Sequence, residues 1–184
     1  MRDLSLHLLD IVENSIRAGA KNVRISIFKD KCRILHLTIE DDGCGMDKEM
    51  LGKVQDPFTT SRTSRKIGLG LPLLTQNARL TGKDVKIESK VGIGTKVFAE
   101  FDTNSIDCLP LGDIAQTICS LILSNPEKPE FYLNCCSEAG EMSFSTVEIR
   151  QALHGVPLNE PEIIEWIGES IQEEILPIFG GIVI

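Results

Sequence analysis

The sequence predicts an α/β two-layer sandwich, in which helices pack on a mostly antiparallel sheet. Apolar residues recur at helical spacing over residues 4–16, which indicates an amphipathic helix. Residues 23–27 and 34–39 alternate between apolar and polar side chains, as half-buried strands do. Two more strands are expected over 84–89 and 95–101, after a second helix. Helices and strands in this order bury their apolar faces against each other as two layers.

The connections between these elements carry their own signals. The second helix is expected from Leu71 to Arg79, with Pro72 tolerated in its first turn and Gly82 beyond its end. A short helix is expected from about Lys48 to Val54. Residues 55–67 are polar and rich in Thr, Ser, Arg and Lys, so we expect a mobile loop there.

Beyond the last of these strands the pattern restarts, and residues 105–184 are expected to form a small α/β appendage. Trp166 is expected to belong to the core of this part rather than to a docking face. The expected elements are a helix near 111–124, strands over 131–135 and 142–145, a helix that Ser145 and Glu148 cap, and a last helix that Asn159 caps.

Charge divides the chain at the same place. Residues 1–104 hold 17 Lys+Arg and 14 Asp+Glu, a net charge of +3, whereas residues 105–184 hold 2 and 13, a net charge of −11. We therefore predict two units, 1–104 and 105–184. The acidic unit argues against nucleic-acid binding, which needs cations that neutralise phosphates. It is expected to present a surface to a protein partner.

The composition also bears on location. The most apolar stretch, residues 114–123, falls well short of the roughly 20 residues that a membrane-spanning helix needs. The first residues lead directly into a helix without a signal-peptide pattern. Six cysteines without metal-ligand spacing are expected to be reduced, mostly buried thiols. We therefore expect a cytoplasmic protein that does not enter a membrane.

Three Gly-x-Gly elements stand out, at Gly43–Gly45, Gly68–Gly70 and Gly92–Gly94. None of them extends to the dinucleotide-binding or P-loop motif, so those two nucleotide sites are excluded. One Gly-x-Gly alone is weak evidence, because glycine serves backbone turns more often than ligands.

Polar residues elsewhere in the sequence, together with these glycines, indicate a nucleotide site. Asp10 and Asn14 are four residues apart and share one face of the first helix. The Asn14 oxygen suits Mg²⁺, and Asp10 can accept a proton from an attacking water. Asp41, at the end of a strand, can accept a hydrogen bond from the amine of adenine. Gly70 opens a helix whose free N–H groups can face phosphates.

Each of these residues also has a plainer interpretation. Taken singly, Asp10 is a solvated helix residue, Asn14 a surface amide and Asp41 part of a turn. Their joint spacing favours a nucleotide site.

The motifs resemble those of the GHKL superfamily, whose members share the Bergerat ATP-binding fold. This superfamily includes histidine kinases, gyrase-type topoisomerases, heat-shock chaperones, MutL-type ATPases and anti-sigma-factor kinases. The resemblance covers residues 4–101. The matching segments are 10–20, similar to the N box; 41–46, similar to the G1 box; 57–61 and 68–71, similar to the F and G2 boxes; and 92–95, similar to the final box.

The resemblance implies a site for ATP and Mg²⁺. Asn14 would hold the metal, Asp41 would read the adenine amine and residues 55–67 would form a lid over the phosphates. Asp10 would be the catalytic base; it stands where these ATPases usually carry Glu, one methylene longer, and this predicts slow hydrolysis. The residues implied to contact the nucleotide are Asn14, Asp41, Gly43, Gly45, Met46, Phe58, Thr60, Arg62, Lys66, Gly68, Leu69, Gly70, Leu71 and Thr95.

Two functions from different classes stay open. The first is an enzyme, either a small ATPase or a protein kinase that phosphorylates Ser on a partner, as anti-sigma-factor kinases do. The second is a non-catalytic switch module, in which ATP closes the lid and the acidic half presents a surface to a partner. Asp10 favours chemistry, and the absence of a substrate-side domain favours the module. Homodimer formation is left open, and a DNA-directed role is the weakest reading.

Overall fold

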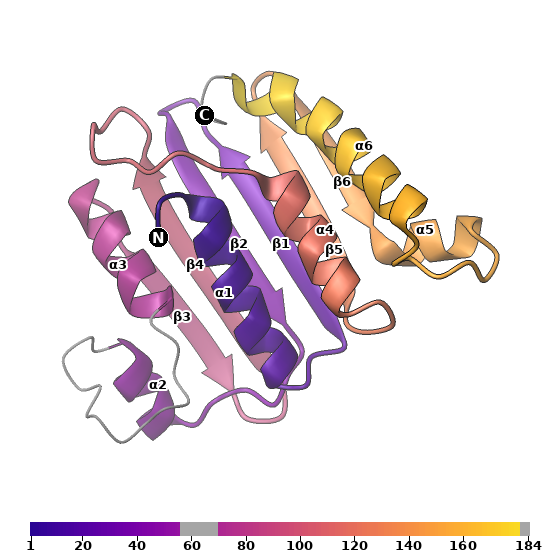
Figure 1. Cartoon of the computed structure of the whole chain (residues 1–184). Coiled ribbons are helices and arrows are strands. Elements are labelled where there is room, and N and C mark those ends of the chain that lie inside the picture. The colour runs from indigo at the N-terminus through magenta and orange to yellow at the C-terminus, as the bar shows by residue number, and fades with distance from the viewer. Residues whose placement is uncertain (56–69, 181–184) are drawn as a thin grey trace.

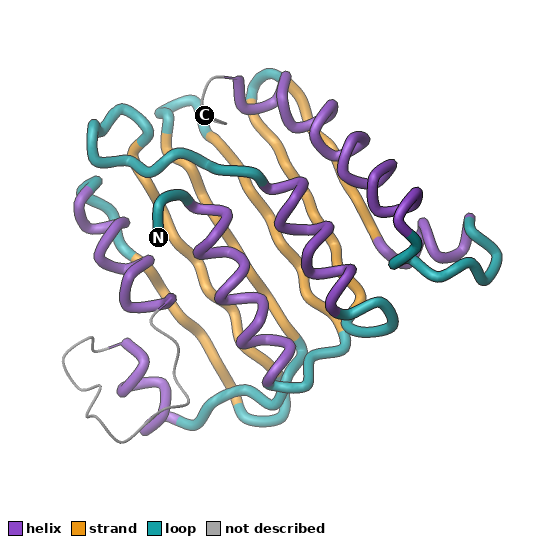
Figure 2. The backbone as a smooth tube through the Cα atoms, in the orientation of Figure 1, coloured by secondary structure: helices purple, strands orange, loops and turns teal. Residues whose placement is uncertain are grey.

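Six strands form one sheet, and helices cover one of its faces (Figure 1, Figure 2). The structure is a computed structural model that describes residues 1–55 and 70–180. Its elements are α1 (Leu4–Arg17), β1 (Asn22–Lys29), β2 (Ile34–Asp41), α2 (Lys48–Gln55), α3 (Gly70–Leu80), β3 (Val85–Lys90), β4 (Gly94–Asp102), α4 (Ile114–Ser124), β5 (Glu130–Ser137), β6 (Gly140–Ser145), α5 (Thr146–Ala152) and α6 (Pro161–Phe179).

The strand order is β3-β4-β2-β1-β5-β6, and every neighbouring pair except β1 and β5 is antiparallel. The predicted two-layer α/β sandwich with a mostly antiparallel sheet is confirmed. The parallel pairing aligns Asn22 with Glu130 and Phe28 with Cys136. Residue 104 lies between β4 and α4, and the segments on both sides of it contribute strands to the same sheet. The acidic part therefore continues the first sheet instead of building a second one.

One hydrophobic core runs under all the long helices. Alternate strand residues, such as Ile25, Leu37 and Leu133, are buried against the helix layer. From the helix layer, α1 contributes Leu8 and α6 contributes Ile171 to this core, and both have at most 1% of their surface exposed. The nucleotide-related motifs and the acidic part thus share one packed interior.

Three details of the acidic part differ from the prediction. Ser145 is the N-cap residue of α5, as predicted, but its side chain makes no capping hydrogen bond, and the buried Thr146 hydroxyl beside it donates to Glu130. Asn159 does not cap α6: Glu160 is the N-cap residue, since Pro161 fixes the first helical position. Trp166 is 54% exposed and does not belong to the core, because the row of isoleucines that includes Ile167 faces the sheet instead.

Within residues 1–55 and 70–180, no helix combines the length and the apolar character that crossing a bilayer requires.

Candidate nucleotide-binding site

Asp41, the last residue of β2, is held rigidly at the edge of the helix layer. It is buried, with 9% of its surface exposed. Its Oδ2 atom accepts a hydrogen bond from the Ser15 hydroxyl at 2.6 Å, and its Oδ1 atom accepts one from the Gly43 backbone N–H at 2.9 Å. A carboxylate has about four acceptor positions. Asp41 therefore keeps the capacity to accept a further bond from a ligand amine.

Ser15 is a site residue that the sequence interpretation missed. It belongs to the buried stripe of α1, among apolar residues. A small hydroxyl among large apolar side chains is a signal in itself, since a buried hydroxyl needs a partner. Here that partner is Asp41.

The glycines let three backbone segments meet beside Asp41. A Cβ atom on Gly45, where φ is +66°, would lie 2.1 Å from the Lys90 carbonyl oxygen. A Cβ atom on Gly94, where φ is +134°, would lie 1.9 Å from the Asp41 carbonyl oxygen. These glycines are therefore required first by the packing of the loop after β2 against the β3–β4 turn. They shape the site by permitting that packing.

Ser89, a second residue that the sequence interpretation missed, joins Met46 to Thr95. Its hydroxyl accepts a hydrogen bond from the Met46 N–H at 2.8 Å and donates one to the Gly94 carbonyl at 3.0 Å. The Thr95 hydroxyl lies 2.8 Å from the same oxygen. Met46 and Thr95 come from distant boxes of the sequence, and the structure brings them together beside Asp41, which pairs with Thr95 across β2 and β4.

On the phosphate side of the predicted site, Asp10 meets the beginning of α3. Its Oδ2 atom is buried and has no hydrogen-bond partner among the described residues. A Cβ atom on Gly70, the first residue of α3, would lie 1.8 Å from that oxygen. Leu71 follows with its side chain buried in the core. The carboxylate thus lies against the positive end of a helix, where negative charge is favoured.

Asn14 lies one turn beyond Asp10 on α1. Its Oδ1 atom accepts a hydrogen bond from the Arg17 guanidinium at 3.1 Å, and the same guanidinium pairs with Glu13 at 2.6 Å. The Arg17 side chain is 62% exposed, so it can turn away and leave the Asn14 oxygen available.

These oxygens fit a magnesium ion. In the described part of the chain, no three His, Cys, Asp or Glu side chains are placed so that they could hold a metal ion together. Mg²⁺ does not need one, because it keeps several waters and takes only one or two protein oxygens beside the phosphates. The Asn14 amide oxygen is a donor of that kind, and the Asp10 oxygen does not have to bind the metal.

His7 ties α1 to α3 close to this position. It is fully buried, and its Nε2 atom lies 2.9 Å from the Asn77 side-chain nitrogen. Burial lowers the pKa of His7, which therefore stays neutral near pH 7. Nothing in the sequence alone indicated this contact.

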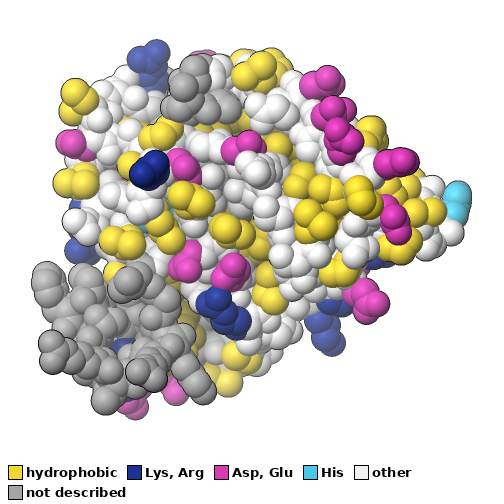
Figure 3. Space-filling model, viewed as in Figure 1, with side chains coloured by type: hydrophobic (Ala, Val, Ile, Leu, Met, Phe, Trp, Pro, Cys, Tyr) yellow, Lys and Arg dark blue, Asp and Glu magenta, His cyan; other side chains and the backbone are white. Residues whose placement is uncertain are grey.

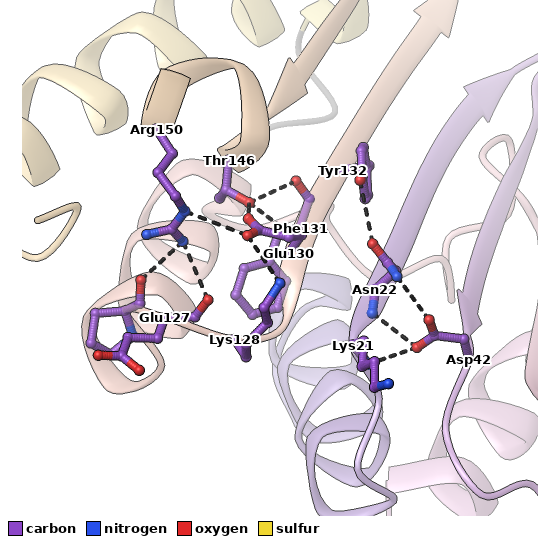
Figure 4. Close-up of polar contacts among 11 residues, drawn as sticks. Lys21, Asn22, Asp42, Glu127, Lys128, Glu130, Phe131, Tyr132, Thr146 and Arg150 are labelled. Atoms are coloured by element: carbon purple, nitrogen blue, oxygen red, sulfur yellow. Dashed lines mark hydrogen bonds and ion pairs between the residues drawn. The ribbon is translucent and has the colours of Figure 1, made fainter. Parts of the chain in front are cut away.

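A polar network links the loop after Asp41 to the acidic part (Figure 4). The Asp42 carboxylate accepts hydrogen bonds from the Lys21 N–H at 2.6 Å and from the Asn22 backbone and side-chain nitrogens. Partial burial alone raises the pKa of Asp42, but these bonds outweigh it and lower the pKa. The Tyr132 hydroxyl on β5 donates to the Asn22 side-chain oxygen at 3.3 Å.

The remaining predicted site residues lie outside the described part of the chain, and so does most of the predicted lid. These residues are Phe58, Thr60, Arg62, Lys66, Gly68 and Leu69.

Comparison with known proteins agrees with this geometry. The signal transduction histidine-protein kinase AtoS of Escherichia coli is 33% identical over 89 residues, which are 47% of this chain and 14% of that protein. Sporulation kinase C of Bacillus subtilis is 32% identical over 89 residues, 47% of this chain and 20% of that protein. The chain thus corresponds to a minor part of these relatives' length.

A solved structure shares the fold. The crystal structure of the N-terminal domain of a DNA repair protein aligns with a TM-score of 0.54 at 13% identity, and the alignment covers 79% of this chain and 53% of the other. Residues 2–105 match the family described as histidine kinase-, DNA gyrase B-, and HSP90-like ATPase. That segment contains every nucleotide-related motif of the sequence. The chain therefore belongs to the GHKL family of ATPases and carries the ATP-binding domain of that family.

Proposed function

We propose that this chain binds ATP with Mg²⁺ and is a cytoplasmic regulatory enzyme, which transfers the γ-phosphate either to water or to a Ser of a protein partner. Asp41 would accept a hydrogen bond from the adenine amine, since its carboxylate is already fixed by Ser15 and Gly43. Asn14 would supply the protein oxygen for the metal. Bound Mg²⁺ would offset the charge of the phosphates and orient them for in-line attack.

The observation that carries the proposal of catalysis is the free Oδ2 atom of Asp10. A general base needs an acceptor position that no other group of the protein occupies. This oxygen is buried, has no described partner and lies against the first residue of α3. In the proposed step, the oxygen of a water or of a serine hydroxyl bonds to the γ-phosphorus, and Asp10 takes the proton from that oxygen. The bond from that phosphorus to the bridging oxygen breaks, and ADP leaves.

The second proposal is a switch module without turnover, and a different observation favours it. Strand β5 of the acidic part pairs with β1 from Asn22 to Phe28. The Tyr132 hydroxyl bonds Asn22, which in turn bonds Asp42 in the loop beside the proposed nucleotide site. A conformational change of that loop on ATP binding would be transmitted to the acidic part through these hydrogen bonds. In this proposal the acidic part presents a surface to a protein partner in only one nucleotide state.

The test follows γ-labelled phosphate from Mg-ATP in the purified chain and in two variants, Asp10→Asn and Asn14→Ala. Asp10→Asn keeps the size of the side chain and removes the base, so turnover should fall about 10²- to 10⁴-fold with ATP still bound. Asn14→Ala removes the proposed metal ligand, so a given concentration of Mg²⁺ should support turnover less well. Turnover that Asp10→Asn leaves unchanged would refute the assignment of the base. Bound ATP that is never cleaved or transferred would favour the switch module.

A further inference from the structure

A groove runs between the edge strand β6 and the helix α6, at the opposite end of the sheet from β3. It encloses a hollow of about 190 Å³. Four successive residues of β6, 142–145, line this hollow. Its apolar lining includes Met142, Phe144 and Trp166, and Glu148 and Glu174 also line it.

The backbone edge of β6 is poorly protected against another strand. Among the described residues it pairs only with β5. Proteins commonly protect such edges with charged side chains, above all Lys, or with Pro. The opposite edge, β3, carries Lys86, Glu88 and Lys90 at alternate positions, whereas β6 has one charged residue, Glu141, and neither Lys nor Pro. An extended segment can therefore add to β6 with few obstacles.

Trp166 gives the groove an exposed anchor. It is the single tryptophan of the chain and is 54% exposed. Ser170 and Glu174 follow it at intervals of four residues on α6, and all three line the groove. Tryptophan is enriched among the residues that dominate the energy of protein–protein contacts. A side chain inserted beside Trp166 would remove it from water.

The negative charge of the surrounding surface favours a basic partner. Glu148 and Glu174 form no ion pair with any described residue. The two basic residues after position 104, Lys128 and Arg150, both pair with Glu130 (Figure 4). Acidic side chains gather over α6, beside an apolar area (Figure 3). A second copy of the chain would bring the same carboxylates face to face, so charge complementarity favours a basic partner.

We propose that the groove between β6 and α6 binds an extended segment of a partner protein and that this segment adds to β6 as a further strand, whose side chains on the face toward α6, at every second position, are apolar residues and Lys or Arg. Main-chain hydrogen bonds to an exposed sheet edge supply affinity in such complexes, and pockets for alternate side chains supply specificity. The apolar side chains enter beside Met142, Phe144 and Trp166, and the cations face Glu148 and Glu174. The inference rests on the proposed partner role of the acidic part, but it requires no nucleotide.

The experiment is a selection of random twelve-residue peptides displayed on phage against the full chain. Selected peptides are then synthesised, and their binding is followed by the fluorescence of Trp166. The test variant is the double substitution Glu148→Lys with Glu174→Lys. The matched control is Glu127→Lys, an exposed residue of the same acidic part that does not line the groove. Binding of a fluorescent ATP analogue to every variant reports separately on the fold and on the nucleotide site.

We expect selected peptides that carry apolar residues and Lys or Arg at every second position, and a shift of the Trp166 emission to shorter wavelength on binding. The double variant should weaken binding at least tenfold, and Glu127→Lys should leave it unchanged. Proline in the middle of a selected peptide should also abolish binding. The proposal is overturned if no such peptides are enriched or if the double variant binds them equally well. It is also overturned if the chain alone dimerises and already shields Trp166, because the occupant is then a second copy.

Discussion

Replacing Gly70 by Ala tests the contact between α1 and α3 that places the predicted base. The added Cβ atom would lie 1.8 Å from Asp10 Oδ2 and 2.7 Å from its Cγ atom, so the carboxylate must move. Overpacking of this kind costs about 1–3 kcal/mol. Alanine in a helix gains up to about 1 kcal/mol over glycine, which offsets part of that cost. We therefore expect Gly70→Ala to lower the free energy of unfolding by about 1–2 kcal/mol and to reduce turnover more strongly than ATP binding.

A double-mutant cycle with Asp10→Ala isolates the clash. With the carboxylate removed, the closest remaining Asp10 atom is its Cβ at 3.1 Å, which a shift of a few tenths of an ångström relieves. In that background Gly70→Ala should be neutral or slightly stabilising, so the coupling free energy should be at least about 1 kcal/mol. Urea denaturation of the four proteins, followed by circular dichroism, measures it. Equal effects of Gly70→Ala in both backgrounds would refute the contact.

Three further changes test other parts of the site and fold. Gly45→Ala should abolish binding of a fluorescent ATP analogue, because the new Cβ would meet the Lys90 carbonyl oxygen at 2.1 Å and neither backbone can yield easily; unchanged affinity would contradict the described loop. Since burial lowers the pKa of His7 below its usual 6.5, the unfolded chain takes up the proton first. Stability should thus be complete above pH 6.5 and fall by up to about 1.4 kcal/mol per pH unit below it. This decline should disappear in His7→Gln when urea denaturation is repeated across pH. Glu130 is the opposite kind of group: burial alone raises its pKa, but the Thr146 hydrogen bond and the cation of Arg150 outweigh it and lower the pKa below 4.5. The contribution of Glu130 to the free energy of unfolding should be present above pH 4.5 and be lost as the pH falls through the lower pKa of the folded state. Glu130→Gln should lower the free energy of unfolding by about 1.5–3 kcal/mol at pH 7, measured by thermal or urea unfolding.

The elements of residues 1–104 were predictable because their local signals agree with their long-range packing. In β1 and β2 the apolar residues at every second position, from Val23 to Ile27 and from Leu35 to Ile39, are buried, whereas Phe28 lies on the other face and is exposed. The placement of β5 beside β1 was not predictable in this way. A parallel neighbour more than a hundred residues away leaves no local pattern, and only its side-chain alternation is visible in the sequence.

Helix starts were the weakest prediction, for a local reason. Ser145 and Asn159 both have good capping side chains, yet neither makes the capping hydrogen bond. At the first, the buried Thr146 hydroxyl donates to Glu130 at 2.6 Å and sets the backbone there. At the second, the fixed φ of Pro161 begins the helix after Glu160. Tertiary contacts and proline geometry thus outweighed side-chain preference.

The sequence indicates a candidate site residue where the chemistry needs a particular residue type. It does not indicate a residue that only holds another residue in place. Asp10, Asn14 and Asp41 were predicted as site residues because two carboxylates and an amide at these spacings match ATP chemistry. Ser15 and Ser89 were missed because each acts through a neighbour: Ser15 bonds Asp41, and Ser89 joins Met46 to the β3–β4 turn. Serine occurs too widely for a single position to indicate such a role before the fold is known.

The length of the side chain at position 10 shows how the structure changes a prediction made from the sequence. Slow hydrolysis was expected because Asp is one methylene shorter than the Glu usual in related ATPases. Reach, however, depends on the distance between helices as well as on the side chain. Because Gly70 has no Cβ, α3 approaches α1 so closely that the Asp10 oxygen already lies where that atom would be. The missing methylene therefore does not by itself separate the carboxylate from the start of α3, and a slow turnover, if measured, requires a cause other than reach.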